Sequence, residues 1–245
     1  DTYELGEPQT LTQEETAETI VPDYCPDIAR IISAEGVVCL HGGTEQDGVT
    51  GTVRVTVLYT PENESGVRAL EFAMPFSAQG EGLAGCAHVV VETEIELLES
   101  RMLNPRKIFT RCKLVTHLAG CRKVCLTISS DAETDPALLV EKRCCGQTVS
   151  LLRQVAEKDL TFSETMSLSL GREGAAELLH CRANGIVTET KAIGNKLIFK
   201  GVFLVSALYR TIGGQLASAS AELPFSQIME TDSTEENTQV SMRLR

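Results

Sequence analysis

Apolar and polar residues alternate along much of this chain, most regularly over residues 51–59 and 201–209. A period of two residues is typical of a β-strand with one buried face. The residues that share that face are Val53, Val55, Val57 and Tyr59 in the first stretch and Phe203, Val205, Ala207 and Tyr209 in the second. Each stretch opens with glycine and closes with Leu-Tyr. The chain therefore contains an internal repeat built on strands.

The similarity continues on both sides of these two strands. Upstream, residues 34–38 correspond to 183–187, and downstream, residues 74–77 correspond to 223–226. Asp47-Gly48 and Gly194-Asn195 are dipeptides that favour hairpin turns between the upstream and central strands. Because proline has no N–H to donate, we expect the downstream strands to end near Pro75 and Pro224. One folding unit is present twice.

Two further alternating stretches, residues 89–97 and 107–118, carry opposite charges on their polar faces. The first presents Glu92, Glu94 and Glu96, and the second presents Lys107, Arg111 and Lys113. If the two strands pair, each opposite-charge pair contributes roughly 0.2–1 kcal/mol. An acidic metal site is the alternative interpretation of the three glutamates.

The length and the net charge of the chain limit the number of domains and the kinds of partner that we expect. A chain of 245 residues accommodates two domains of about 100–150 residues. The chain has 34 acidic against 22 basic residues, and no basic stripe with interleaved aromatics is present, so we expect no nucleic-acid partner. It has no apolar run of about 18 residues and no charged-then-apolar leader, so we expect no membrane partner.

These patterns predict an all-β protein of two tandem β-sandwich-like repeat domains with short helical turns. The first domain spans residues 1–130, a linker spans 131–159, and the second domain spans 160–245. Residues 239–244 take the place of 89–94, and no counterpart of 103–118 follows, so we expect the second domain to be incomplete at its C-terminal end and to present an open edge. Residues 1–19 are read as a strand or an arm, which in a neighbouring chain could pair with that edge.

The central strand of the second repeat is apolar on both faces. Val202, Leu204 and Ser206 stand where the first repeat has Thr52, Arg54 and Thr56. A strand buried on both sides must be covered, either by the first domain or linker or by another subunit. Small residues nearby would allow a close approach. The candidate assembly surface is Val202, Leu204, Ser206, Ala217 and Ala219.

A segment with two prolines precedes the first repeat strand. Pro26 could open a short helix that carries Ile28, Ile31 and Ile32 towards the sheet. This segment, residues 22–28, together with residues 34–36, 51–59, 72–77 and 103–107, resembles the SPOCS domain family of spore-forming Firmicutes. The resemblance covers most of the chain, more strongly in the first copy, because the second has Gly171-Arg172-Glu173-Gly174 in place of the paired prolines.

The resemblance implies a tandem repeat and an association with the spore coat. It implies synthesis in the mother-cell cytoplasm and deposition on the endospore surface, with the protein itself or other coat proteins as partners. The family offers no enzymatic motif and no cofactor to carry over, and no LysM segment, which some members have, is visible in this chain.

Nine cysteines, an odd number, carry most of the chemistry. None has the C-x2-C spacing of a zinc ribbon. Cys121 and Cys125 lie about 13 Å apart if both belong to one strand, too far for a disulfide between them. One interpretation is that these are small buried thiols, and Cys112 fits it best. The other, favoured by the resemblance, is cross-linking between subunits, with these candidates: Cys25, Cys39, Cys86, Cys121, Cys125, Cys144, Cys145 and Cys181.

Catalysis finds little support in the sequence. The four histidines lie in separate segments without a recognisable nucleophile, and no phosphate-binding loop is present. A metal cluster of Cys39, His41, His180 and Cys181 can be drawn, but its two halves belong to different repeats. We therefore expect no enzyme and no cofactor. The leading hypothesis is a structural spore-surface protein that self-assembles as a coat layer or filament through edge strands and disulfides. The alternative is an adaptor that binds another coat protein without polymerising.

Overall fold

The computed structural model describes residues 2–41, 48–127, 148–158, 173–231 and 238–244, with single positions at 129, 141, 143, 146, 161, 163 and 165. Strands dominate this part of the chain, which contains no helix. The strands are β1 (Thr2–Leu5), β2 (Gln9–Ile20), β3 (Ile28–His41), β4 (Gly48–Pro61), β5 (Arg68–Gln79), β6 (His88–Asn104), β7 (Lys107–Val124), β8 (Ala175–Ile193), β9 (Lys196–Thr211) and β10 (Leu216–Glu230). The all-β prediction is confirmed.

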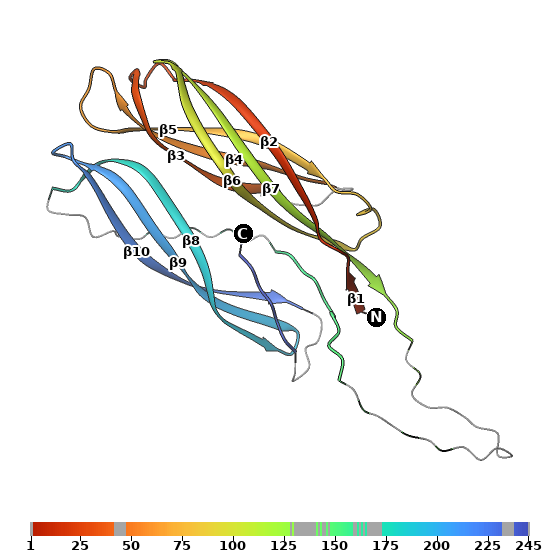
Figure 1. Cartoon of the computed structure of the whole chain (residues 1–245). Coiled ribbons are helices and arrows are strands. Elements are labelled where there is room, and N and C mark those ends of the chain that lie inside the picture. Colours follow the sequence, from red (N-terminus) through yellow and green to blue (C-terminus); the bar gives the residue numbers. More distant parts are fainter. Residues whose placement is uncertain are drawn as a thin grey trace.

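The first repeat forms a two-sheet sandwich (Figure 1). In sheet A, β7 pairs with β6 on one side and with β1 and β2 on the other. In sheet B, β4 lies between β3 and β5. All pairings are antiparallel. The inner faces of both sheets supply one core, whose fully buried side chains include Val53, Val55, Val57, Tyr59, Ile108 and Leu114.

The second repeat forms sheet C, in which β9 lies between β8 and β10. The order and directions reproduce those of sheet B, so the predicted repeat is confirmed in three dimensions. Val205, Ala207 and Tyr209 are buried on one face of β9, as their counterparts are in β4. Among the described residues, no second sheet faces sheet C as sheet A faces sheet B.

Both prolines lie inside strands, contrary to the prediction that the strands end there. Pro75 pairs with Thr52 and Pro224 with Val202, and the strands continue to Gln79 and Glu230. β5 and β10 are the outer strands of their sheets, where a missing N–H on the open side breaks no ladder bond.

Two expectations for the N-terminal part of the chain are wrong. Pro26 opens no helix, because β3 starts at Ile28 and the residues before it form a turn. Of the two readings of the N-terminal segment, the strand is correct and the arm offered to a neighbour is wrong, since β2 pairs with β7 of its own chain from Gln9 to Ile20. It therefore completes the first domain and is not available to a neighbour.

A glycine opposite a phenylalanine explains why each repeat strand opens with glycine. Gly51 pairs with Phe76 and Gly201 with Phe225, and the phenylalanine ring covers the glycine in both. A β-carbon at Gly201 would lie 2.5 Å from Cζ of Phe225 and 2.2 Å from the carbonyl oxygen of Ile186. The backbone oxygen cannot move away without breaking the strand pairing.

Gly201→Ala should therefore destabilise sheet C by about 2 kcal/mol, the typical cost of overpacking. The free energy of unfolding, measured with urea, checks this. Gly146→Ala is the matched control, because nothing lies within 4 Å of a β-carbon there. Equal stability of the two variants would show that the ring and carbonyl adapt to the added methyl group.

Part of the chain between the two repeats, residues 148–158, forms hydrogen bonds to both of them. The backbone N–H of Tyr3 and the hydroxyl of Thr2 donate to the carbonyl of Leu152, and Lys158 donates to the carbonyl of Ile228. Residues 148–158 therefore contact both sheet A and sheet C, whereas most of the predicted linker lies outside the described residues. No helix of the described chain is long and apolar enough to cross a membrane.

Candidate functional site

One loop of the first repeat is held in place by an arginine that lies about 80 positions away in the sequence. Residues 21–27 carry the two prolines, and the β6–β7 turn supplies Arg106. The Arg106 guanidinium donates to the carbonyl oxygens of Val21 and Cys25, both at 2.8 Å, and to the carboxylates of Asp27 at 3.0 Å and Asp23 at 3.1 Å. The planar guanidinium of arginine can bind several acceptors at once, because its five N–H donors are fixed in direction. We call residues 21–27 the clamped loop.

Backbone and core contacts fix the same loop. The N–H of Val21 donates to the carbonyl of Arg106, and that of Ile28 donates to Pro105, both at 2.9 Å. The hydroxyl of Tyr59 donates to the carbonyl of Pro26 at 3.3 Å. Burial, and then the neighbouring Cys25 thiol, raises the pKa of Tyr59 to about 12, so the phenol keeps its proton and remains a donor.

Clamped in this way, the loop presents Asp23 and Tyr24 to solvent. The N–H of Cys25 donates to the carbonyl of Pro22 at 2.9 Å, closing a four-residue turn with Tyr24 in its third position. Tyr24 is 88% exposed, more than any other large hydrophobic side chain among the described residues. The residues that carry the family resemblance form a turn here, and the sequence does not predict their contact with Arg106.

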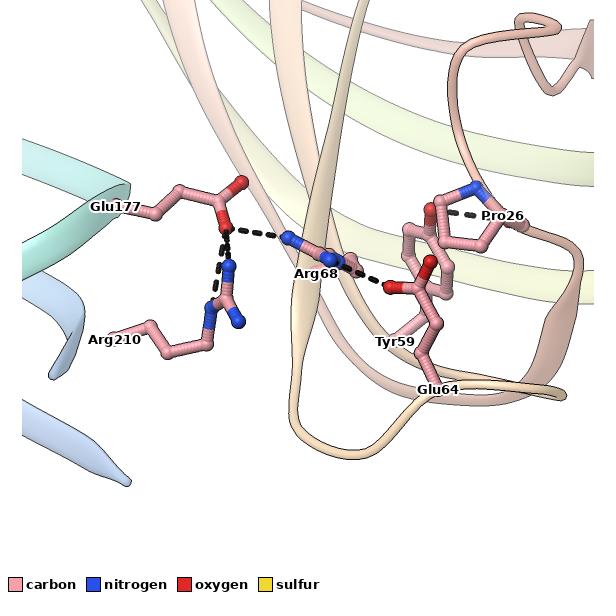
Figure 2. A network of polar contacts seen from close by, with 6 residues as sticks. All are labelled: Pro26, Tyr59, Glu64, Arg68, Glu177 and Arg210. Atoms are coloured by element: carbon pink, nitrogen blue, oxygen red, sulfur yellow. Dashed lines mark hydrogen bonds and ion pairs between the residues drawn. The ribbon is translucent and has the colours of Figure 1, made fainter. Parts of the chain in front are cut away.

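An ion cluster joins the two repeats (Figure 2). Glu177 of β8 accepts from Arg210 of β9 at 2.8 and 3.2 Å and from Arg68 of β5 at 2.7 Å. Arg68 also pairs with Glu64 at 2.5 Å. The hydrogen bond to Glu64 and the charge of Glu177 raise the pKa of the Arg68 guanidinium. One carboxylate therefore connects sheet B to sheet C, a contact that no repeat pattern in the sequence indicates.

Two weaker contacts lie between the same domains. Nε2 of His180 lies 3.3 Å from Oε2 of Glu35, without hydrogen-bond geometry, so only a protonated imidazole would gain from this contact. Arg243 pairs with Glu92 at 2.5 Å, and the side chain of Leu244 lies against Gly185. The C-terminal segment thus contacts both repeats.

The candidate assembly surface is split between the two faces of sheet C. Val202, Leu204 and Ser206 lie on the outer face, while Ala217 and Ala219 pair with Tyr209 and Ala207 on the inner face. Ala219 is buried there, so it is not available to a partner. The outer face instead gains Ile186 and Pro224, which flank Val202 directly on the neighbouring strands.

The predicted charge pairs between residues 89–97 and 107–118 are present in part. Lys113 pairs with Glu96 at 2.9 Å, and Arg111 pairs with Glu99 at 3.0 Å and Glu14 at 3.8 Å. Lys107 pairs with Glu18 of β2. Because β2 and β6 both flank β7, the basic face of β7 is shared by two acidic strands.

The described cysteines are free and differ widely in exposure. Cys125 and Cys181 are exposed, Cys25, Cys39 and Cys86 are half-buried, and Cys112 and Cys121 are buried. Burial raises the pKa of the Cys112 thiol to about 11 and also raises that of Cys121, where Cys86 adds a smaller contribution. A buried, protonated thiol is a poor nucleophile, so Cys121 is a wrong choice for a cross-link between subunits. Cys144 and Cys145 lie outside the described residues.

The histidines are partnered by separate residues. His41 hydrogen-bonds Thr52 at 2.6 Å, His117 hydrogen-bonds Thr10 at 3.0 Å, and the ring of His88 packs against Tyr3. Within the described ranges, no three metal-binding side chains gather, and the four residues drawn as a metal cluster form none. In the part of the chain that the structure describes, the side chains named above form structural contacts and exposed surfaces.

Comparison with known proteins agrees with the resemblance. Residues 175–245 match the family model described as SipL, SPOCS domain. No curated protein and no solved structure matches the chain. The matched residues cover sheet C and the C-terminal segment, and the family suggests a spore coat-associated role. The second repeat of this chain is therefore similar to a SPOCS domain.

Proposed function

We propose that this chain is a structural spore-surface protein that assembles with copies of itself through sheet C. The observation that carries the proposal is the outer face of sheet C, where Ile186, Val202 and Pro224 form one apolar row across all three strands. The corresponding row of sheet B is Cys39, Thr52 and Pro75. Both rows contain a proline, and the second repeat has Ile186 and Val202 where the first has Cys39 and Thr52.

Exposure supports the same surface. Ile186 is 47% and Leu204 39% exposed, and Ile228 lies on the same face further along β10. Exposed apolar residues that adjoin one another mark surfaces that bind other proteins, whereas single ones are ordinary. A second copy offers the same apolar row and would exclude water from both.

The edge of sheet C adds a second mode of contact. β10 pairs with β9 over its whole length without a register shift, and no described strand pairs with its outer side. β8, the opposite edge, has three register shifts, which discourage further pairing. A long, regular edge such as β10 accepts another strand more readily, although Pro224 removes one donor.

Reversing the apolar character of the outer face tests the proposal. Ile186→Lys should reduce self-association at least about tenfold, because a lysine ammonium would have to be desolvated in the contact. Sedimentation velocity over a concentration series measures the effect. Val37→Lys is the matched control, since Val37 is the sequence counterpart on sheet B and is 50% exposed. Equal loss in both variants would contradict an interface on sheet C.

Disulfides would then lock the assembly. Two thiols form one disulfide with loss of two protons and two electrons, which dissolved oxygen accepts. Of the described candidates, Cys125 and Cys181 are the exposed ones. Cross-linked neighbours cannot dissociate, so the polymer would resist heat and denaturant.

We expect a reductant-sensitive ladder on non-reducing gels of the oxidised protein, and the variant Cys125→Ser with Cys181→Ser should shorten it. Cys112→Ala, which removes a buried thiol, should leave the ladder unchanged. An unshortened ladder in the double variant would exclude both exposed cysteines as the cross-link.

The adaptor hypothesis rests on the same exposed surfaces. A chain that stays monomeric in sedimentation but binds a second coat protein through sheet C would favour it. We favour the homopolymer over the adaptor, because every copy of the chain carries the apolar row of sheet C. Two copies therefore supply complementary surfaces without a further protein.

A further inference from the structure

The outer edge of β10 is open in the part of the chain that the structure describes. β10 packs closely beside β9 and beside no other described strand, whereas the edge strands of the first repeat lie next to each other, β2 beside β5 and β3 beside β6. β8, the other edge of sheet C, has three register shifts, and β10 has none. Irregular edges discourage pairing and regular ones permit it. Of the described edges, β10 is therefore the one that best accepts a strand from another chain.

A proline and a lysine show which residues of β10 face the open side. Opposite residues of an antiparallel pair of strands alternate between those that exchange two hydrogen bonds and those that exchange none. Pro224 has no N–H, so its pair with Val202 is of the second kind. The carbonyl oxygen of Ile228, four positions on, accepts from Lys158, which lies outside β9. The even-numbered residues of β10 therefore direct their N–H and C=O groups towards the open side.

The part of this edge that is free for pairing is residues 216–222. At the far end of β10, Lys158 already binds the carbonyl oxygen of Ile228, and Pro224 lacks a donor. The even-numbered residues before Pro224 all have exposed side chains. They are Leu216, Ser218, Ser220 and Glu222, and Glu222 is the one charged residue of this stretch.

A partner for this edge must itself be an open and regular strand, and in a chain that assembles with copies of itself the described strand that fits is β10. We propose that β10 of one chain pairs antiparallel with β10 of a second chain, about a two-fold axis at Ala219. In this register Leu216 lies opposite Glu222 and Ser218 lies opposite Ser220. The four pairs form about eight hydrogen bonds, two for each pair.

The hydrogen-bonding pattern and the proline select this register. An axis that falls between two residues would set even-numbered residues opposite odd-numbered ones, whose N–H and C=O groups face β9. Every axis from Ser220 to the end of the strand brings Pro224 into the pairing, where a donor is missing. An axis at Glu222 would also set two like charges opposite each other, which is destabilising. The axis at Ala219 gives the longest pairing that leaves Pro224 out.

This pairing would join two copies of sheet C into one sheet of six strands. Residues that lie opposite each other in neighbouring strands have their side chains on the same face, so the two outer faces become one continuous surface. The proposal rests on the proposed self-assembly and specifies its building block, a two-fold dimer. Edge pairing and outer-face packing are two different two-fold contacts, so a chain that uses both extends an open line of chains.

Two matched proline variants test the pairing. Ser220→Pro removes an outward N–H inside the proposed register, and Ser226→Pro removes one outside it. Pro224 shows that β10 accommodates proline at an even-numbered position. In the full chain with Ile186→Lys, which removes the outer-face contact, Ser220→Pro should weaken dimers at least about tenfold, because both symmetry-related hydrogen bonds are lost. Ser226→Pro should leave them unchanged. Sedimentation velocity measures association, and urea unfolding checks that both variants fold.

A distance between two spin labels tests the register without a proline. A nitroxide amino acid replaces Ser226 in the full chain with Ile186→Lys, and double electron–electron resonance measures the distance between the labels of a dimer. In the proposed register, position 226 lies opposite position 212 of the second chain, so the labels should be about 45 Å apart. An antiparallel pairing centred on Leu223 gives about 20 Å, and a parallel pairing in register gives about 5 Å.

The outcomes separate this contact from the proposed function. A distance other than about 45 Å, equal association of the two proline variants, or monomers in the Ile186→Lys chain would overturn the pairing of β10 with β10. Ordered polymers of the otherwise unmodified chain that persist in Ser220→Pro would leave the proposed function standing and refute this contact. Dimers with the expected distance, from a chain that forms no polymers, would support the contact and refute the proposed function.

Discussion

Arg106→Ala should lower the free energy of unfolding of the first domain by about 2–4 kcal/mol. The guanidinium makes two hydrogen bonds to carbonyl oxygens and two to carboxylates, and bonds to charged groups are worth about 1.5–3 kcal/mol each when fully buried. We take less than their sum because the side chain is one-third exposed and its bonds are not independent. Urea unfolding measures the loss.

The conservative variant separates charge from geometry in this clamp. Arg106→Lys keeps the positive charge but cannot reach four acceptors at once. It should therefore recover less than half of the lost stability. Full recovery with lysine would show that charge near Asp23 and Asp27 is sufficient and that the planar fork contributes nothing.

Glu177→Lys should separate the two domains and destabilise the chain by about 2–4 kcal/mol. Both Arg68 and Arg210 lie within hydrogen-bond distance of one Glu177 oxygen, so a lysine there would bring three cations together in a half-buried position (Figure 2). Removing one partner of such a group leaves the others desolvated and unpaired. Small-angle X-ray scattering should record a larger radius of gyration, because the charge clasp between sheets B and C is lost.

A second glutamate on the same strand provides the control. Glu189 pairs with Lys200 at 3.3 Å, and both side chains are more than half exposed. An exposed pair contributes about 0–1 kcal/mol, so Glu189→Lys should change little. If Glu177→Lys left both the scattering and the unfolding free energy unchanged, the cluster would not couple the domains.

Alternation and repetition in the sequence were sufficient to predict the central strands of sheets B and C. The face of β4 that carries Val53 to Tyr59 is buried as expected, and β9 repeats it, because a period of two leaves only one register that buries the apolar side. The prolines misled because Pro75 and Pro224 are compatible with edge strands, and which strand lies at an edge depends on the whole sheet.

The site was less predictable because its contacts join distant segments. Arg106 lies about 80 positions from the loop it clamps, and Glu177 more than 100 positions from Arg68. No periodicity reports such pairs. The one available signal was that residues 22–28 and 103–107 both carry the resemblance to the SPOCS family, which suggests that they meet. That the candidate assembly surface is divided between the two faces of sheet C could be recognised only from the register of β10 against β9.

Negative-stain electron microscopy of the purified full chain tests the central claim most directly. We expect ordered fibres or sheets that disappear in the Ile186→Lys variant and persist in Val37→Lys. Dispersed single particles of the unmodified chain, after its thiols have been oxidised, would contradict self-assembly through sheet C.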